Sequence, residues 1–178
     1  LNQFDHISTI SQRMLDHLAN KGLPKQKTFL LVNWVDCDQI FPTSNLTSLR
    51  TEWQLTADTL VILYSGNMGQ KQGLEILIEG ARLLQAEQRF QFVLCGEGAA
   101  RAALQQQAEG LQNVHFYPLQ PVEWLNELLN TADIHVLTQR ANAADLVMPS
   151  KLSGMLASGR PVVATAQPGT ELASVIDQ

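Results

Sequence analysis

Lys151 stands at the start of an expected helix, directly after Pro149 and Ser150. The free amides and the dipole of a helix N-terminus bind anions, and proline fits the first helical position because its missing N–H would have no partner there. A cation in the first turn is disfavoured by about 0.3–1 kcal/mol, so Lys151 breaks a local rule. A bound phosphate would compensate for this. The alternative is a solvated lysine that points sideways, and these residues alone leave both open.

A second candidate anion site is the glycine-containing stretch 65–73, which follows the apolar run 60–64. Glycines between a strand and a helix let backbone amides approach a phosphate closely. Within the stretch, Asn67 offers hydrogen bonds and Lys71 offers positive charge. The glycine spacing is neither GxGxxG nor a Walker A motif, so a turn in which glycine only relieves strain is the alternative.

The other polar residues predict neither a metal site nor a nucleophile. The four histidines lack the spacing of metal ligands, Asp36 and Asp38 are a lone pair of loop carboxylates, and no GxSxG motif is present. Gly96-Glu97-Gly98 is a lone GxG, which close packing at a tight turn also explains. We therefore expect no metal and no cofactor, and no general base is evident.

Composition limits the class of protein. The chain has 178 residues, of which 45% are hydrophobic and 16% charged, as in a globular domain. A net charge of −5 argues against a nucleic-acid partner. No apolar run reaches the length of a membrane span, and Cys37 and Cys95 read as free, buried thiols, so we expect a cytoplasmic protein. The chain begins at Leu1 without Met and stops soon after a helical pattern starts, which indicates a fragment of a longer protein.

The elements that position the candidate residues alternate regularly. Apolar strand-like runs and helical patterns predict an α/β fold with a Rossmann-like, doubly wound parallel sheet. Ligands of such sheets bind outside the carboxyl ends of the strands, where we expect the loops 65–73, 96–98 and 138–150 to face one crevice. The expected strands are 4–10, 28–33, 60–64, 90–95, 113–117, 133–137 and 162–164, and the expected helices are 12–21, 48–55, 74–85, 99–108, 121–130 and one from Pro149 to Gly159.

Five segments resemble, in order, the C-terminal half of the retaining GT-B glycosyltransferases of family 4. The likeness is greatest to the branch that assembles bacterial exopolysaccharides of the colanic-acid type. The segments are 33–36, 64–75, 94–98, 132–136 and 149–164, so the resemblance extends over nearly the whole chain.

The resemblance implies one half of a GT-B fold, in which two Rossmann-like domains face each other. Residues 1–40 would be the end of the N-terminal half, the crossover and the start of the C-terminal domain, and residues 41–178 a nucleotide-sugar-binding domain truncated at its C-terminus. Such enzymes need no metal, because basic residues and a helix N-terminus stabilise the diphosphate. By this resemblance the donor-binding residues are Gly66, Asn67, Lys71, Gly96, Leu119, Pro149, Ser150, Lys151 and Leu152.

The chain departs from the family pattern at three positions. Asn67 stands where members carry Arg or Lys, and the paired glutamates, eight residues apart, fall at Leu146 and Gly154. The second glutamate holds the donor ribose, so Gly154 puts ribose recognition in question. The first lies near the transferred sugar, where Asp145, one position away, is the candidate catalytic substitute.

The resemblance predicts the donor-binding domain of an enzyme that transfers a sugar from a nucleoside-diphosphate sugar to a lipid-linked glycan acceptor with retention. The acceptor would bind the missing half, which would also make any contact with the inner face of the membrane, and this fragment alone would be inactive. The alternatives are a GT-B sugar-nucleotide epimerase and a catalytically inactive nucleotide-sugar-binding or scaffold module. The sequence identifies neither the base nor the sugar.

Overall fold

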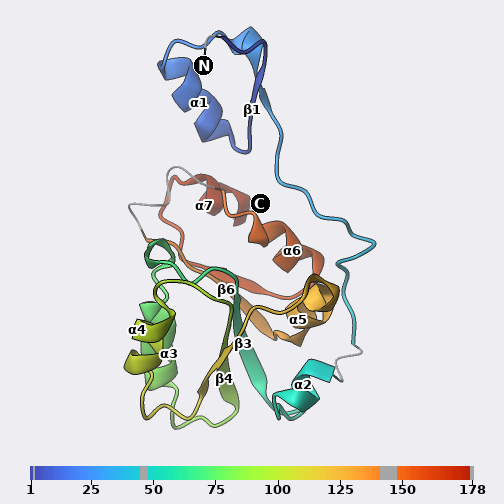
Figure 1. The fold of residues 1–178 in the computed structure, drawn as a ribbon, viewed down its shortest axis with the longest axis vertical. Coiled ribbons are helices and arrows are strands. Elements are labelled where there is room, and N and C mark those ends of the chain that lie inside the picture. The colour runs from blue at the N-terminus through green and yellow to red at the C-terminus, as the bar shows by residue number, and fades with distance from the viewer. Residues whose placement is uncertain (2, 45–47, 141–147, 177–178) are drawn as a thin grey trace.

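The computed structural model describes residues 1, 3–44, 48–140 and 148–176. Within these ranges the chain forms two parallel sheets, one of two strands and one of five. The two sheets lie in separate parts of the structure (Figure 1).

The five-stranded sheet confirms the predicted doubly wound α/β fold. Its strands are β3 (Leu60–Ser65), β4 (Phe90–Cys95), β5 (Val114–Tyr117), β6 (Ile134–Leu137) and β7 (Val162–Ala164), all parallel and ordered β5-β4-β3-β6-β7. The chain winds outward from β3 to β5 and then returns to β6 on the other side of β3. The strand order therefore reverses between β3 and β6, which is where such sheets open a ligand crevice.

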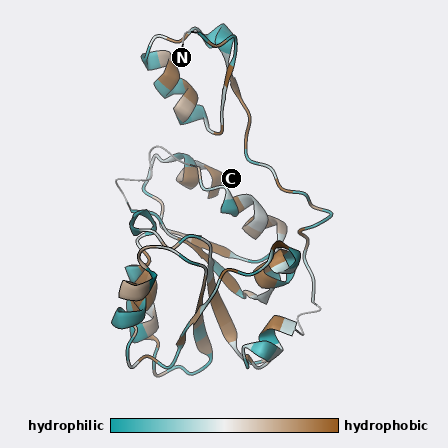
Figure 2. Cartoon of the chain, viewed as in Figure 1, coloured by the Kyte–Doolittle hydropathy of each residue, from teal (hydrophilic) through white to brown (hydrophobic). Residues whose placement is uncertain are grey.

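Helices cover both faces of this sheet because the side chains of β3 and β4 alternate between two cores. The helices α3 (Glu75–Leu83) and α4 (Arg101–Gln107) pack on the face that carries Tyr64 and Phe92. On the other face lie α2 (Ser48–Glu52), α5 (Leu125–Thr131), α6 (Lys151–Ala157) and α7 (Glu171–Ile176). The strands between these layers are largely hydrophobic (Figure 2).

The N-terminal residues form a separate small unit (Figure 1). It consists of β1 (Ile7–Thr9), α1 (Gln12–Asn20) and β2 (Thr28–Leu30), with a 3-10 turn, η1 (Lys25–Lys27), before β2. Ser11 caps α1 as expected, because its hydroxyl accepts a hydrogen bond from the Met14 amide at 3.3 Å. Glu171 of α7 accepts hydrogen bonds from the backbone amides of Gln12 and Arg13, which ties this unit to the larger one.

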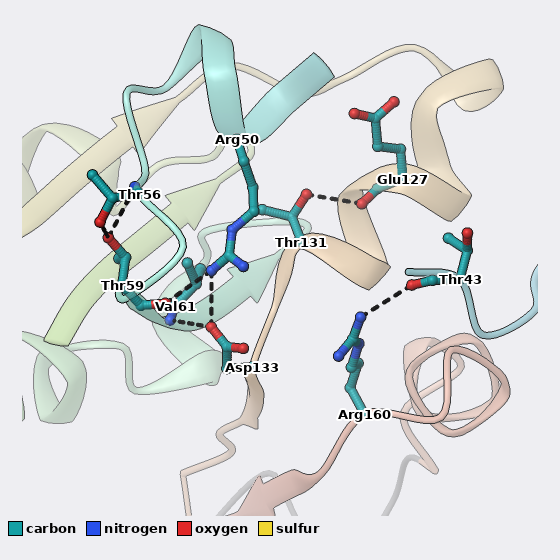
Figure 3. A network of polar contacts seen from close by, with 9 residues as sticks. All are labelled: Thr43, Arg50, Thr56, Thr59, Val61, Glu127, Thr131, Asp133 and Arg160. Carbon is teal, nitrogen blue, oxygen red and sulfur yellow. Dashed lines mark hydrogen bonds and ion pairs between the residues drawn. The ribbon is translucent and has the colours of Figure 1, made fainter. Parts of the chain in front are cut away.

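Residues 31–44 connect the two sheets and contain no helix or strand, in line with the irregular segment expected from 34 onward. The side chain of Asn130 on α5 holds this connecting segment, donating to the Phe41 carbonyl and accepting from the Thr43 amide, both at 2.9 Å. Arg160 adds a hydrogen bond to the Thr43 carbonyl at 3.1 Å (Figure 3).

A part-buried ion pair fixes the central strands at the edge opposite the site (Figure 3). Arg50 on α2 contacts the Asp133 carboxylate at 3.0 Å, and the same carboxylate accepts from the Val61 amide at 2.8 Å. Asp133 thus joins the starts of β3 and β6, so their carboxyl ends lie side by side.

Several predicted boundaries are wrong. The strands β1 and β2 are shorter than 4–10 and 28–33, because they pair only with each other over three residues. The expected helix 121–130 divides into the 3-10 turn η3 (Val122–Trp124) and α5. Pro149 lies two residues before α6 and outside it, since its carbonyl closes a turn with the Leu152 amide at 3.2 Å.

Candidate functional site

A cavity of about 540 Å³ opens at the carboxyl edge of the larger sheet, at the point where the strand order reverses. We call it the switch-point cavity. Its wall combines the ends of β3 and β4, the start of α6, the loop before α5 and the connecting segment. The lining residues are Trp34, Val35, Ile40, Ser65, Gly66, Cys95, Leu119, Gln120, Pro121, Val122, Leu125, Leu128, Leu129, Ser150, Lys151, Ser153 and Gly154.

Lys151 supplies the positive charge of the switch-point cavity. It is the first residue of α6, yet its amine turns back to the end of β3, where it donates to the Ser65 carbonyl and the Tyr64 hydroxyl, both at 3.0 Å. The same amine lies 4.1 Å from the centre of the Tyr64 ring. Burial lowers the pKa of Lys151 to about 8. Lys151 is therefore not the sideways, solvated lysine of the alternative interpretation: it is a half-buried cation whose contacts among the described residues are to neutral groups.

Tyr64 is a site residue that the sequence pattern does not reveal, because it reads there as the last apolar residue of a strand. Its side chain is fully buried, and its hydroxyl accepts from Lys151 and donates to the Asn67 carbonyl at 2.6 Å. Burial raises the pKa of this hydroxyl far above its usual range, so it stays protonated and neutral. Tyr64 thus links the Lys151 amine to the backbone of the glycine-containing loop.

The backbone of Gly66 packs against the Lys151 amine, and the backbone of Gly96 packs against Gly66. A Cβ on Gly66 would lie 2.9 Å from the Lys151 amine, and a Cβ on Gly96 would lie 1.9 Å from the Gly66 carbonyl oxygen. The Gly96 amide donates to the Tyr117 carbonyl at 3.0 Å and so has no free hydrogen for a ligand. Gly96 therefore serves the site through close backbone packing, the reading that the lone GxG left open.

Arg101 holds the same loop in place. Its guanidinium donates to the Tyr117 carbonyl at 3.2 Å and pairs with Glu97 at 2.6 Å, and its side chain is only 18% exposed. It is thus a structural part of the Gly96 turn.

Lys71 lies in a different depression, which we call the Lys71 hollow. It lies on the 3-10 turn η2 (Gln70–Gln72), and the hollow of about 410 Å³ is lined by Gln70, Lys71, Glu75, Ala99, Ala100, Ala103 and Arg140. Arg140 fixes this turn, because its guanidinium donates to the Gln70 carbonyl at 2.8 Å and its amide to the Lys71 carbonyl at 3.0 Å. Arg140 also pairs with Glu75 at 2.7 Å. The two predicted cationic residues therefore do not share one cavity.

The far end of the switch-point cavity is apolar. Ile40, Leu128 and Leu129 are buried there, and Leu119 and Val122 are exposed along its rim. Gly154 lines the wall, and a Cβ on it would contact a Leu129 methyl at 3.4 Å. Among the lining residues that the structure describes, none carries a carboxylate.

The cavity thiol is not a nucleophile. Cys95 donates to the Pro118 carbonyl at 3.1 Å, and burial raises its pKa to about 11, so it stays protonated near neutral pH. The expectation of two buried thiols is wrong for Cys37, which is exposed.

The structure brings together only part of the predicted donor-binding set. Gly66, Leu119, Ser150 and Lys151 line the switch-point cavity. The other five are not lining residues of this cavity. Asn67 and Lys71 are exposed outside it, and Gly96 is packed beneath it. Pro149 comes just before the lining residue Ser150, and Leu152 is buried in the core with its amide bonded to the Pro149 carbonyl. Asp145 and Leu146 lie outside the described residues.

Across residues 1, 3–44, 48–140 and 148–176, no group of three or more His, Cys, Asp and Glu side chains is arranged to hold a metal ion. Over the same ranges, none of the helices has both the length and the apolar character needed to cross a bilayer.

Residues 59–177 match the family model "Glycosyl transferases group 1". Over 181 aligned residues the chain is 38% identical to the "Putative colanic acid biosynthesis glycosyl transferase WcaI" of Escherichia coli (strain K12). That alignment covers 99% of this chain and 44% of WcaI, so the chain spans less than half the length of this relative.

Solved structures of similar fold include two bacterial proteins. The Anabaena Alr3699/HepE complex with UDP-glucose aligns with a TM-score of 0.75 at 21% identity, covering 99% of this chain and 54% of that chain. WaaG, a glycosyltransferase involved in lipopolysaccharide biosynthesis, aligns with a TM-score of 0.75 at 18% identity, covering 95% of this chain and 46% of WaaG.

Proposed function

The chain belongs to the glycosyl transferases group 1, and from that premise we propose that it is the donor-binding part of a retaining glycosyltransferase. Its five-stranded sheet is a Rossmann-like half of the GT-B fold. The proposed donor is a nucleoside-diphosphate sugar, bound in the switch-point cavity. WcaI and the UDP-glucose complex of HepE support this choice of ligand class, and UDP is the first nucleotide to test.

The observation that carries the proposal is the half-buried Lys151 amine beside Gly66. When the sugar leaves, the bond between its anomeric carbon and the diphosphate oxygen breaks, and negative charge develops on the diphosphate. A cation that is already fixed in a poorly hydrated site stabilises such charge strongly. The Lys151 amine is 3.0 Å from the Ser65 carbonyl at the end of β3, the edge where ligands of doubly wound sheets bind.

The other predicted residues take lesser roles in this proposal. Ser150 and the Leu119 loop contact the donor from the cavity wall, and Lys71 and Asn67 add polar contacts from outside it. Asp145 is proposed as the carboxylate near the transferred sugar, in place of the glutamate that related enzymes carry. No metal takes part in this scheme.

Residues 1–40 are proposed to comprise the end of the other half of the enzyme, the crossover and the start of the C-terminal domain. Phe29, Leu30, Leu31 and Val32 support this, because they form an apolar run in and after β2 and are 43–57% exposed. A strand that is apolar on both faces is typical of a parallel sheet covered by helices on both sides. The acceptor, proposed as a lipid-linked glycan of a colanic-acid-type exopolysaccharide, would bind mainly to that other half.

Calorimetry on the full-length protein tests the proposal. UDP-, GDP- and dTDP-sugars are titrated into the wild type, and we expect one nucleotide class to bind with micromolar affinity. A sugar transferred to a glycan acceptor with retention of its anomeric configuration completes the assignment. If none of the donors binds at millimolar concentration, the proposal is wrong and an inactive scaffold is the better description.

An epimerase of the same architecture is the second candidate. Product analysis separates the two: a transferase links the sugar to an acceptor, whereas an epimerase yields an isomerised or hydrolysed donor without one.

A further inference from the structure

The switch-point cavity has a polar end and an apolar end, and a nucleotide has the same division. The Lys151 amine, Ser65 and Ser150 mark the polar end, and leucine, isoleucine and valine side chains mark the other. A diphosphate suits the cation, whereas a planar base is the part of a nucleotide that an apolar wall accommodates. A hexose is poorly suited to that wall, since its hydroxyls would find few partners there.

Trp34 also lines this cavity, and it is far more exposed than the other tryptophans. It is 81% exposed, although it lines the cavity, and it lies on the connecting segment between the two sheets. Trp53 provides the contrast, because it is 5% exposed and stacks on Tyr117 with ring centres 4.0 Å apart. Among the described residues, Trp34 has neither a stacked ring nor a hydrogen-bond partner.

An exposed tryptophan face at the rim of an apolar cavity is a stacking platform for a planar group. The residue next to it, Val35, lines the same cavity, and Ile40 further along the segment is buried. Both contacts hold the connecting segment at the cavity wall. Leu119 and Val122 are exposed lining residues of the same cavity, so apolar side chains from two segments line it together with Trp34.

We propose that Trp34 stacks on the nucleobase of the bound donor and closes the apolar end of the cavity. This inference rests on the proposed function and deepens it, since it makes Trp34 a binding residue for the base. Stacking depends little on which base is present, because every base has a π-face. Trp34 therefore contributes affinity, and the choice among bases falls to groups that reach the base edges.

Calorimetry on the full-length protein tests this with two ligands, UDP and inorganic pyrophosphate, which lacks a base. Trp34→Ala is expected to weaken UDP binding about tenfold or more and to leave pyrophosphate binding unchanged. Trp34→Phe retains an aromatic face and should lose less than about half of that effect on a logarithmic scale. Trp124→Phe is the matched control, because Trp124 is 37% exposed on η3 and is not among the lining residues.

Fluorescence gives a readout that does not depend on the stability of the alanine variant. UDP should quench tryptophan emission in the wild type and in Trp124→Phe, and this quenching should be lost in Trp34→Phe. The inference is overturned if UDP binds the wild type and Trp34→Ala equally well. It is also overturned if Trp34→Ala weakens UDP and pyrophosphate by the same factor, which would indicate a structural role. If wild-type protein binds pyrophosphate but no nucleoside diphosphate, or neither ligand, the proposed function fails and this inference fails with it.

Discussion

The switch-point cavity and the Lys71 hollow both offer positive charge at the same sheet edge, but their lysines are held in opposite ways. The Lys151 amine is half-buried, contacts only neutral groups among the described residues, and has a pKa lowered to about 8. Lys71 is exposed, and the cation beside it, Arg140, is already paired with Glu75. A buried cation without a carboxylate partner costs stability and gains most from an incoming anion, whereas an exposed one gains little.

Sequence position alone therefore does not show which of two basic residues contributes more to binding an anion. Both lysines follow a strand end and a loop, and both were assigned to the diphosphate. Only Lys151 has the desolvated environment in which a charge interaction is strong. The predictions that follow either separate the two regions further or remove the difference.

The largest effect is expected from Gly96→Ala, which should lower the free energy of unfolding because Gly96 packs beneath the switch-point cavity. The new Cβ would meet the Gly66 carbonyl at 1.9 Å, and φ at Gly96 is +149°, so the backbone must shift. We expect a loss of about 3 kcal/mol or more in the free energy of unfolding, measured by urea denaturation. Gly110→Ala is the control, because φ there is +83° but a Cβ has open space, and its cost should be about 1 kcal/mol. Equal losses would show that Gly96 is not a packing residue.

The next effect is expected from Lys151→Met. Removing the cation should weaken nucleoside-diphosphate binding by about 1.5–3 kcal/mol, or roughly 10- to 150-fold, as measured by calorimetry. The melting temperature should rise, because a neutral side chain no longer has to be desolvated as a charge.

The pH dependence of the unfolding free energy tests whether the Lys151 amine is desolvated in the folded protein. Its folded-state pKa of about 8 lies below that of an unfolded lysine, so the unfolded chain binds more protons between these two values. The unfolding free energy of the wild type should therefore rise as the pH increases above 8. Lys151→Met lacks this rise, so the difference between the two unfolding free energies should change with pH. Parallel pH profiles of the two proteins would contradict the half-buried, desolvated state of Lys151.

The smallest effect is expected from Lys71→Met. An exposed cation contributes about 0.2–1 kcal/mol, so the affinity for the nucleotide should fall by at most roughly fivefold. Because exposed charges are screened, this loss should disappear at about 1 M salt, where the Debye length is about 3 Å. A loss as large as that of Lys151→Met, and one that persists in high salt, would remove the distinction between the two regions.

The sequence was sufficient for the sheet and for the approximate place of the site, but not for its composition. The alternation of strands and helices predicted the order of elements from Leu60 onward, and Gly66 and Lys151 were found from their positions at strand and helix ends. Tyr64 was missed because a buried tyrosine inside an apolar run shows no sign of the partners its hydroxyl will find. Trp34 was missed because the connecting segment reaches the cavity only through tertiary packing.

Two other assignments depend on the same kind of information. Gly96 was read as a ligand contact, and only the structure shows that its amide is already bonded to Tyr117. Leu152 was assigned through its place in a motif, but the turn closed by Pro149 uses its amide and the core takes its side chain. Hydrogen bonds between segments far apart in sequence decide such cases, and periodicity carries no information about them.

The most direct test of the account is proton uptake on nucleotide binding at pH 8, measured by calorimetry in buffers of different ionisation enthalpy. With a pKa of about 8, the free Lys151 amine is about half protonated at this pH, and a bound diphosphate should raise its pKa. The account predicts that the wild type and Lys71→Met each take up about half a proton per UDP bound, and that Lys151→Met takes up almost none. UDP binding by the wild type without proton uptake, or equal uptake by Lys151→Met, would contradict the claim that the Lys151 amine holds the donor diphosphate.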